Sequence, residues 1–448
     1  MSALMVSISG VRGIVGETLT PEVVLAYASA FAEYCGYGTV VVGRDSRVTG
    51  ELVRQVVFAG LVSSGCKVID LGICTTPGVQ VMVKHLKADG GIIITASHNP
   101  VQWNALKFVG NKGFFLSKED NTIFMPLAAK SGFKRVLWDE VKKIEAYPDA
   151  IRIYTQKLLK FSLINKLAIK KKKFKVVIDC VNGAGSVMCP GLLRALGCRV
   201  VELNCKPDGL FPHEPEPTPA NLKQLCAAVK KHKAHVGFAV DPDADRLAIV
   251  SEKGVAIGEE YTLALCADYF LSRKKGPVVV NLSTSRMIND VCEKYGVKLT
   301  RTPVGEINVS TELVRQKGVF GGEGNGGAMA PEIHACRDAC TGMELVLQYM
   351  AASGKSVSGL VASLPSYAIV KTKYDCSAVD MARAFDRFKN GFPGGAVDEQ
   401  DGIRVDIGKS WVQLRKSNTE PVARIIAEAP TAAEAQQLTE QAKALLFG

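Results

Sequence analysis

Long hydrophobic runs are missing from this chain of 448 residues. Its apolar stretches, such as Val278–Val280, fall far short of the roughly 20 residues that cross a bilayer. The first ten residues, Met1–Gly10, have no basic segment and no apolar segment of the length that a secretory signal requires. We therefore expect no membrane anchor and no signal peptide.

The sequence also lacks the even set of cysteines that a disulfide framework needs. The 13 cysteines are an odd number, and most sit in apolar runs, as Cys180 and Cys266 do. That placement is typical of buried, reduced thiols and favours the cytoplasm. Cys336 and Cys340 have His334 nearby but no second ligand pair at zinc spacing, so we interpret them as apolar residues at a helix start.

Acidic residues are the scarcer charge: 55 basic residues face 44 acidic ones, a net charge of +11. A basic surface attracts nucleic acid or a phosphorylated small molecule. The main basic run, Lys170–Lys173, leads directly into an apolar segment, and aromatic residues are not interleaved with basic ones as on base-stacking surfaces. We expect a phosphorylated small molecule as partner, and no nucleic acid.

A repeated pattern fills most of the chain: a short apolar run, a polar loop rich in Gly or Asp, then a helical stretch. It occurs at 39–47, 91–100, 176–185, 237–246, 278–281 and 318–327. This alternation predicts βαβ units in mixed or parallel sheets. Ligands of such sheets bind beyond the carboxyl ends of the strands, where these loops lie.

The C-terminal part alternates apolar and polar residues at 401–408 and 410–415, as antiparallel strands do. Residues 431–446 predict an amphipathic helix with Thr431 as N-cap and Glu434 three residues on. The predicted fold is α/β: three tandem mixed-sheet α/β domains plus a C-terminal α+β domain around a central cleft. The expected domains are 1–146, 147–251, 252–364 and 365–448.

Three carboxylates alternate after a predicted strand, at Asp241, Asp243 and Asp245. Oxygen ligands from one loop suit a hard divalent cation. A calcium-binding helix–loop–helix is disfavoured, because Arg246 occupies the sixth loop position, where glycine makes the turn. A phosphatase of the haloacid-dehalogenase type, with Asp241 as nucleophile, and a solvated acidic turn stay open on this segment alone.

Gly322–Gly327 has the spacing of a dinucleotide-binding loop, but a lone match is weak, and the next suitable acid, Glu344, lies in a helical pattern. The glycines favour close approach of a sugar, with Glu323 and Asn325 as polar contacts; a plain glycine turn is the alternative.

Two further loops carry reactive or anion-binding groups. Ser97 ends a predicted strand beside His98, which either transfers protons or only orients the loop. A phosphate cradle of guanidinium, hydroxyl and amide groups is predicted at Arg415, Ser417, Asn418 and Thr419.

Four such loops in this order closely resemble those of the α-D-phosphohexomutase superfamily, over essentially the whole chain. They match its phosphoserine, metal, sugar and phosphate loops. Supporting matches occur at 9–13, 43–47, 208–217 and 302–305.

The resemblance implies a role for each loop. Ser97 is expected to carry a phosphoryl group and, with Asp241, Asp243 and Asp245, to hold Mg²⁺. Lys107 aligns with a basic residue proposed for proton transfer, and Arg12 and Arg246 are expected near the transferring phosphoryl group. Glu323 and Asn325 are expected to bind sugar hydroxyls, and the cradle in the last domain to bind the distal phosphate.

Three residues depart from the family pattern. Pro242 replaces a usual glycine, Gly327 stands where many members have histidine, and Ser283 falls near a lysine of the glucose/mannose branch.

The implied reaction moves a phosphoryl group between the 1- and 6-positions of a hexose phosphate, with a sugar 1,6-bisphosphate as activator. We expect glucosamine phosphate as substrate, because a Glu306 carboxylate beside the sugar would attract its C2 ammonium; the alternative role for Glu306 is to brace a helix start. A phosphoglucomutase/phosphomannomutase is the alternative, and a non-catalytic phosphosugar sensor a remoter one. The chain is expected to be a monomer or homodimer.

Overall fold

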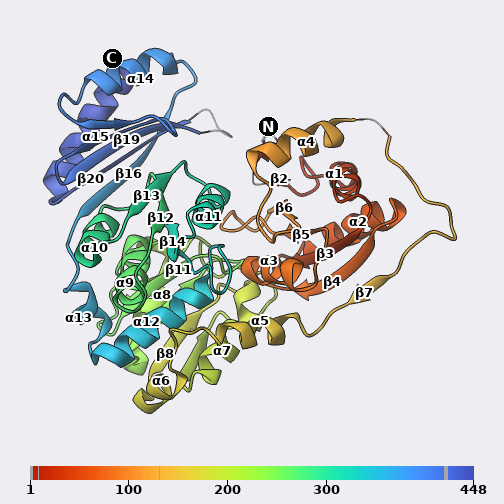
Figure 1. The fold of residues 1–448 in the computed structure, drawn as a ribbon, viewed down its shortest axis with the longest axis horizontal. Helices are drawn as coiled ribbons and strands as arrows, with labels where there is room; N and C mark the ends of the chain where they lie inside the picture. The colour runs from red at the N-terminus through yellow and green to blue at the C-terminus, as the bar shows by residue number, and fades with distance from the viewer. Residues whose placement is uncertain (1–3, 9, 131, 418–421) are drawn as a thin grey trace.

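The structure, a computed structural model, describes residues 4–8, 10–130, 132–417 and 422–448 and builds four successive sheets (Figure 1). The first sheet has seven strands in the order β1-β2-β6-β5-β3-β4-β7. Its strands are β1 (Met5–Ser7), β2 (Gly10–Ile14), β3 (Thr39–Arg44), β4 (Lys67–Ile73), β5 (Gly90–Ile94), β6 (Trp103–Gly110) and β7 (Ile144–Ala146). Its helices are α1 (Pro21–Tyr34), α2 (Gly50–Ser63), α3 (Thr76–His85) and α4 (Lys118–Ala129).

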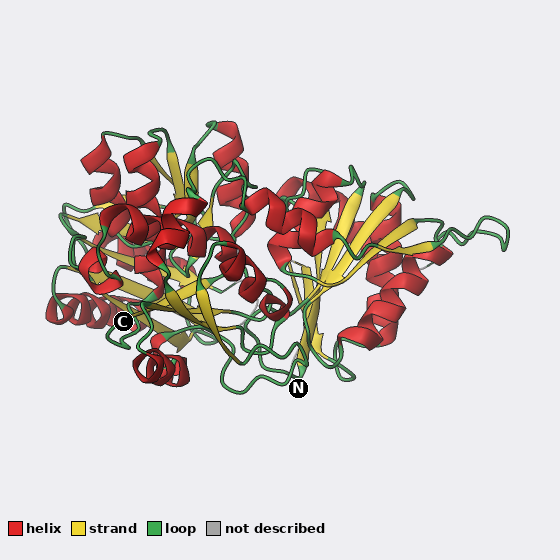
Figure 2. Ribbon diagram, turned by 90° about the horizontal axis from the view of Figure 1, so that it is seen from below, coloured by secondary structure: helices red, strands yellow, loops and turns green. Residues whose placement is uncertain are grey.

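Helices cover both faces of this sheet (Figure 2). Successive strand residues point to opposite faces, so Val40 and Val42 pack in the core formed with α1, α2 and α4, while Val41 packs with α3. Strand β5 is parallel to β3 and antiparallel to β6, which makes the sheet mixed, as predicted.

The second and third sheets have four strands each, in the orders β11-β10-β8-β9 and β13-β12-β14-β15. The second unit contains α5 (Ala150–Leu158), α6 (Lys166–Lys172), β8 (Lys175–Asp179), α7 (Cys189–Ala195), β9 (Arg199–Leu203), α8 (Lys223–His232), β10 (Val236–Val240) and β11 (Leu247–Ser251). The third contains α9 (Glu259–Arg273), β12 (Val278–Asn281), α10 (Met287–Tyr295), β13 (Leu299–Thr302), α11 (Glu306–Arg315), β14 (Phe320–Glu323), β15 (Gly327–Met329), α12 (Ala339–Ser353) and α13 (Val357–Val361).

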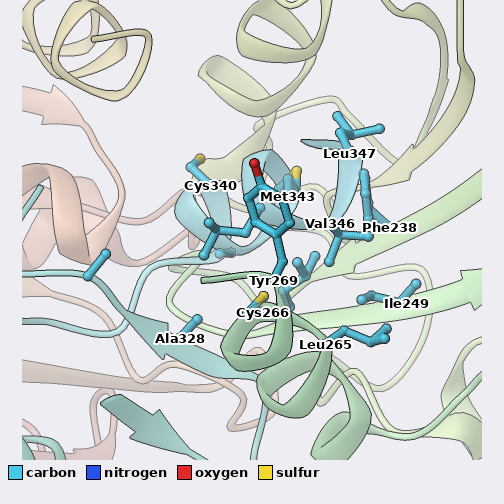
Figure 3. Close-up of a cluster of buried hydrophobic side chains, with 14 of the residues drawn as sticks. Phe238, Ile249, Leu265, Cys266, Tyr269, Ala328, Cys340, Met343, Val346 and Leu347 are labelled. Carbon is cyan, nitrogen blue, oxygen red and sulfur yellow. The ribbon is translucent and has the colours of Figure 1, made fainter. Parts of the chain in front are cut away.

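These two units share one hydrophobic core (Figure 3). Phe238 and Ile249 come from the second sheet, whereas Leu265 on α9 and Met343 on α12 come from the third unit. The contact is close: a Cβ added at Gly342 of α12 would lie 2.9 Å from the Leu247 side chain of β11. The loop between β10 and β11, which carries the three aspartates, is therefore fixed relative to the third unit.

The fourth sheet is antiparallel, in the order β16-β20-β19-β18-β17. Its elements are β16 (Ala368–Asp375), α14 (Met381–Asn390), β17 (Ala396–Asp398), β18 (Ile403–Ile407), β19 (Ser410–Lys416), β20 (Val422–Ala429) and α15 (Ala432–Phe447). Thr431 and Glu434 form the predicted capping box. Buried Glu428 accepts hydrogen bonds from the Ser285 hydroxyl and the Arg286 amide, which seats this unit on the third.

The α/β fold with a distinct C-terminal unit is confirmed. All 13 cysteines are free thiols, and all but the half-buried Cys205 and Cys226 are buried. Among the described residues, none of the helices combines the length and apolar character that crossing a bilayer requires.

Candidate active site

The three predicted aspartates lie buried in the loop between β10 and β11. Ala244 adopts a left-handed φ of 54°, which turns the chain back sharply. Asp241 Oδ1 accepts the amides of Asp245 at 3.1 Å and Arg246 at 3.2 Å, so the turn is closed on itself. The carbonyl of Pro242 accepts the Ala184 amide at 2.7 Å, which ties the loop to the segment that follows β8.

This carboxylate cluster fits a divalent cation. One oxygen from each aspartate lies within 4.8 Å of the others. Among the described residues, the triad is the only cluster of three or more side chains of metal-ligand type. Asp243 Oδ1 and Asp245 Oδ1 are buried with no hydrogen-bond partner in the described part of the chain. Burial, and then repulsion by Asp243 and Asp245, raises the pKa of Asp241. A cation bound between the carboxylates would offset this repulsion.

Ser97 faces this triad from the loop after β5. Its hydroxyl donates to Asp241 Oδ2 at 2.8 Å, and its backbone holds a left-handed φ of 49°. Such a conformation costs a non-glycine residue about 1–3 kcal/mol and needs support from its surroundings.

Arg47 provides that support. Its buried guanidinium donates to the carbonyls of Ser97 at 2.6 Å and Asn99 at 2.7 Å, and also to those of Pro100 and Trp103. Arg47 lies in a segment that matches the family pattern, but its role could not be predicted from the sequence, because nothing local shows where a long side chain ends.

Lys107 enters the site from β6, where it pairs in register with Ile93 of β5. Its ammonium lies 2.7 Å from Asp243 Oδ2, and the Thr76 hydroxyl at the start of α3 donates to the same oxygen at 2.6 Å. Burial alone raises the pKa of Asp243, but the Lys107 charge and the hydrogen bonds bring it well below its usual range. Thr76 is a contact that sequence reasoning missed.

The other predicted cations gather beside Ser97. Arg12 on β2 donates to Asn99 Oδ1 at 2.5 Å, and Arg246 lies 3.2 Å from Glu216. His98 Nδ1 is 3.3 Å from the Ser97 hydroxyl. The Arg246 charge, then burial and the Arg12 charge, lowers the pKa of His98 well below its usual range, so the imidazole is neutral at pH 7.

The predicted sugar loop joins β14 to β15. Glu323 accepts from Asn281 Nδ2 at 2.7 Å and the Gly305 amide at 3.1 Å, and it pairs with Arg337 at 3.0 Å. Half-buried Asn325 accepts the Gly327 amide at 3.3 Å. The Glu323 carboxylate thus has three partners, whereas the Asn325 side chain accepts one long hydrogen bond.

Glu306, expected to attract the sugar ammonium, is paired in the structure. It begins α11, where Oε1 accepts from Gln80 at 2.9 Å and Oε2 pairs with Arg337 at 2.9 Å. Burial raises its pKa to about 6 despite the Arg337 charge. Arg337 was missed because it lies 31 residues further along the chain. Ser283, which falls near a lysine of the glucose/mannose branch, donates its hydroxyl hydrogen bond to Gln413 at 2.7 Å and so links the third and fourth units.

In the fourth unit, Arg415 near the end of β19 lies 3.3 Å from Asp401, which also accepts the Val304 amide at 3.0 Å. The Ser417 amide donates to the Val422 carbonyl at 2.8 Å. Asn418 and Thr419 lie outside the described residues. Ser97 thus contacts Asp241 directly, and Arg337 connects the aspartate loop with Glu323 of the sugar loop. The Arg415 end of the fourth loop is tied to the third unit through Asp401.

Three α/β units, a C-terminal unit and this constellation define an isomerase of the phosphohexomutase class, as the four loops predicted. The chain belongs to the phosphoglucomutase/phosphomannomutase family: its α/β/α domains I, II and III match residues 5–132, 152–254 and 259–367, and its C-terminal domain matches 370–445.

Relatives carry two kinds of name. A "Phosphoglucomutase/phosphomannomutase" of Thermococcus kodakarensis is 39% identical over 442 residues, covering 96% of each chain. A "Probable phosphoglucosamine mutase" of Methanopyrus kandleri is 35% identical, covering 97% of this chain and 95% of its own. The crystal structure of a phosphoglucomutase/phosphomannomutase family protein from Burkholderia thailandensis is 25% identical with a TM-score of 0.85, covering 99% of this chain and 98% of that one.

Proposed function

We propose that this phosphohexomutase interconverts the 1- and 6-phosphates of a hexose through a phosphoserine at Ser97 and a bound sugar 1,6-bisphosphate. The observation that carries the proposal is the Ser97 hydroxyl 2.8 Å from Asp241, in a loop that Arg47 holds in a strained conformation. A reactive oxygen is thereby fixed beside a cluster of metal-ligand type.

In the first half-reaction the bond between phosphorus and Ser97 Oγ breaks, and a bond to the free sugar hydroxyl forms. His98 and Lys107 are the candidates for proton transfer: neutral His98 can accept the proton of that hydroxyl, and the Lys107 ammonium, paired with Asp243, can supply one to the departing Ser97 oxygen. Arg12 and Arg246 offset charge on the transferring group. Asp241, Asp243 and Asp245, with the phosphoserine, would hold Mg²⁺, which would supply further charge neutralisation at that group.

In the second half-reaction the bisphosphate has turned end over end, and its other phosphate returns to Ser97. One cradle must therefore hold the distal phosphate in both orientations, and we assign it to Arg415, Ser417, Asn418 and Thr419. Equivalent treatment of both phosphates makes the two half-reactions close to mirror images, so the same residues serve the isomerisation in both directions.

Arg415→Ala tests the shared cradle. We expect KM to rise roughly 10- to 100-fold for both the 1-phosphate and the 6-phosphate, since a charge-assisted hydrogen bond is worth about 1.5–3 kcal/mol. Steady-state kinetics in both directions measure this. Arg383→Ala, at an exposed position on α14 of the same unit, is the matched control. A rise for one isomer only contradicts the shared cradle.

For the sugar, we propose glucosamine phosphate, with glucose or mannose phosphate as the alternative. The support is charge: Glu306 and Glu323 share the Arg337 guanidinium with Asp245, which also lies 3.9 Å from Arg246, so the two carboxylates on the sugar side face one shared cation. A C2 ammonium gains from this excess of carboxylates over cations, and a C2 hydroxyl does not. The names of the relatives support both choices.

Glu306→Gln tests this choice. We expect glucosamine phosphate to lead in kcat/KM over glucose and mannose phosphates in the wild type, and the lead to shrink roughly 10-fold in the variant, because one negative charge is lost. Glu312→Gln, on the same helix but paired with Arg315, controls for the helix itself. If glucose or mannose phosphate leads in the wild type, the alternative replaces this proposal.

A further inference from the structure

Arg337 pairs with three carboxylates of the site, and nothing in the sequence drew attention to it. It lies between β15 and the start of α12 and is 9% exposed. Each of its three guanidinium nitrogens meets a different carboxylate: Nη2 is 2.6 Å from Asp245, Nε is 2.9 Å from Glu306 and Nη1 is 3.0 Å from Glu323. These partners belong to the metal loop, the start of α11 and the sugar loop.

The segment around Arg337 is itself anchored to both loops. The Asp338 amide donates to the Ala328 carbonyl of β15 at 3.0 Å, and the Ala339 amide donates to the Ala244 carbonyl of the metal loop at 3.3 Å. The Asp338 side chain caps α12. A guanidinium fixed at its root by three such contacts can hold its partners in place, whereas one on a mobile loop could not.

Gly327 is shaped by the same side chain. A Cβ at this position would lie 2.4 Å from Arg337 Cδ and 2.7 Å from Cγ. Gly327 pairs with Glu323 in the regular β14–β15 ladder, so the backbone there tolerates alanine. A side chain at this position, where many family members have histidine, would therefore collide with Arg337 in this structure.

Arg337 engages only one carboxylate oxygen of Asp245 and one of Glu323. Arg337 takes Asp245 Oδ2, whereas Asp245 Oδ1 has no hydrogen-bond partner among the described residues and lies 3.9 Å from Arg246 Nε, in the cluster that fits a cation. On Glu323, Arg337 pairs with Oε2, while Oε1 accepts from Asn281 and Gly305. One rigid fork thus sets the orientation of a metal-ligand candidate and of a sugar-binding candidate.

We propose that Arg337 is a positioning residue that ties the metal loop to the sugar loop, so that affinity for Mg²⁺ and affinity for the hexose phosphate depend on the same guanidinium and on its seat over Gly327. The proposal rests on the proposed function, because it takes the ligand of the Glu323 loop to be the sugar phosphate. It goes beyond that function by naming the residue that fixes the position of the two loops relative to each other.

The test measures binding by calorimetry, with Mg²⁺ alone and with glucosamine 6-phosphate or glucose 6-phosphate. Arg337→Lys keeps the charge and removes the three-nitrogen fork, so it separates geometry from charge. We expect both dissociation constants to rise roughly 10-fold or more, as for other residues that orient metal ligands. Arg54→Lys is the matched control, because Arg54 also bridges two carboxylates, Asp70 and Glu51, away from the site.

Gly327→Ala provides a second route that leaves every charged residue in place. It should displace Arg337 and reproduce both losses, and adding it to Arg337→Lys should cost little more, because both changes remove one interaction. A loss confined to one ligand, or additive losses in the double variant, overturns the proposal. Wild type that binds neither sugar phosphate overturns the proposed function instead, so the two failures are distinguishable.

Discussion

Ser97→Ala is expected to abolish turnover, with kcat falling by roughly 10⁴- to 10⁶-fold, as when a covalent nucleophile is removed from other enzymes. Binding of the sugar phosphate should change little, because the substitution removes only the hydroxyl and leaves the Arg47 contacts to the loop carbonyls intact. Intact-mass measurement of the wild type should show one phosphoryl group, and peptide mapping should place it on Ser97. Kinetics and binding on the same preparation separate loss of chemistry from loss of fold.

Ser64→Ala is the matched control for this change. Ser64 is a buried serine of the same unit that donates to the Gly60 carbonyl at 2.8 Å, outside the site. It should keep full activity. A phosphoryl group mapped to Asp241, with activity surviving in Ser97→Ala, would replace the phosphoserine mechanism with the phosphatase-like alternative.

Asp243→Asn should also be strongly damaging, although less so than Ser97→Ala. The substitution removes one anionic ligand candidate and leaves the buried Lys107 ammonium, 2.7 Å away, without its counter-charge. We expect kcat to fall about 10²- to 10³-fold in both directions, and the Mg²⁺ dissociation constant to rise by a similar factor. Calorimetry with Mg²⁺ and assays with and without chelator measure the two effects separately.

Asp268→Asn is a close control, because Asp268 is also buried and also pairs with a lysine, Lys294, at 2.7 Å, but it does so away from the aspartate triad. It should lower stability while sparing the Mg²⁺ affinity. Activity of Asp243→Asn that equals wild type and resists chelator would refute the metal assignment.

The loops of the site could be predicted because each is local. A buried strand followed by Asp241, Asp243 and Asp245 carries its meaning within a few residues, and the same is true of Ser97 after β5. Thr76 and Arg337 could not be found this way. Thr76 reaches Asp243 across 167 residues and Arg337 reaches Asp245 across 92, and a threonine or arginine at such distances leaves no periodic signal.

The same limit applies to electrostatics. Sequence reasoning placed Glu306 near the sugar and treated its charge as available, because the cation that pairs with it could not be seen. For the fold, the Thr431 capping box was legible because it spans four adjacent positions. The packing of α9 and α12 against β10 and β11 was not, since an apolar helix face does not specify which sheet it will cover.

That packing has a consequence for how the chain can be divided. Phe238, Leu247 and Ile249 are covered partly by helices that follow in the third unit, so a fragment ending after β11 would expose its apolar strands to water. The four sheets thus correspond to three independent bodies at most. Recombination between relatives must exchange the second and third units together, and a junction placed between them would separate strands from the helices that complete their interior.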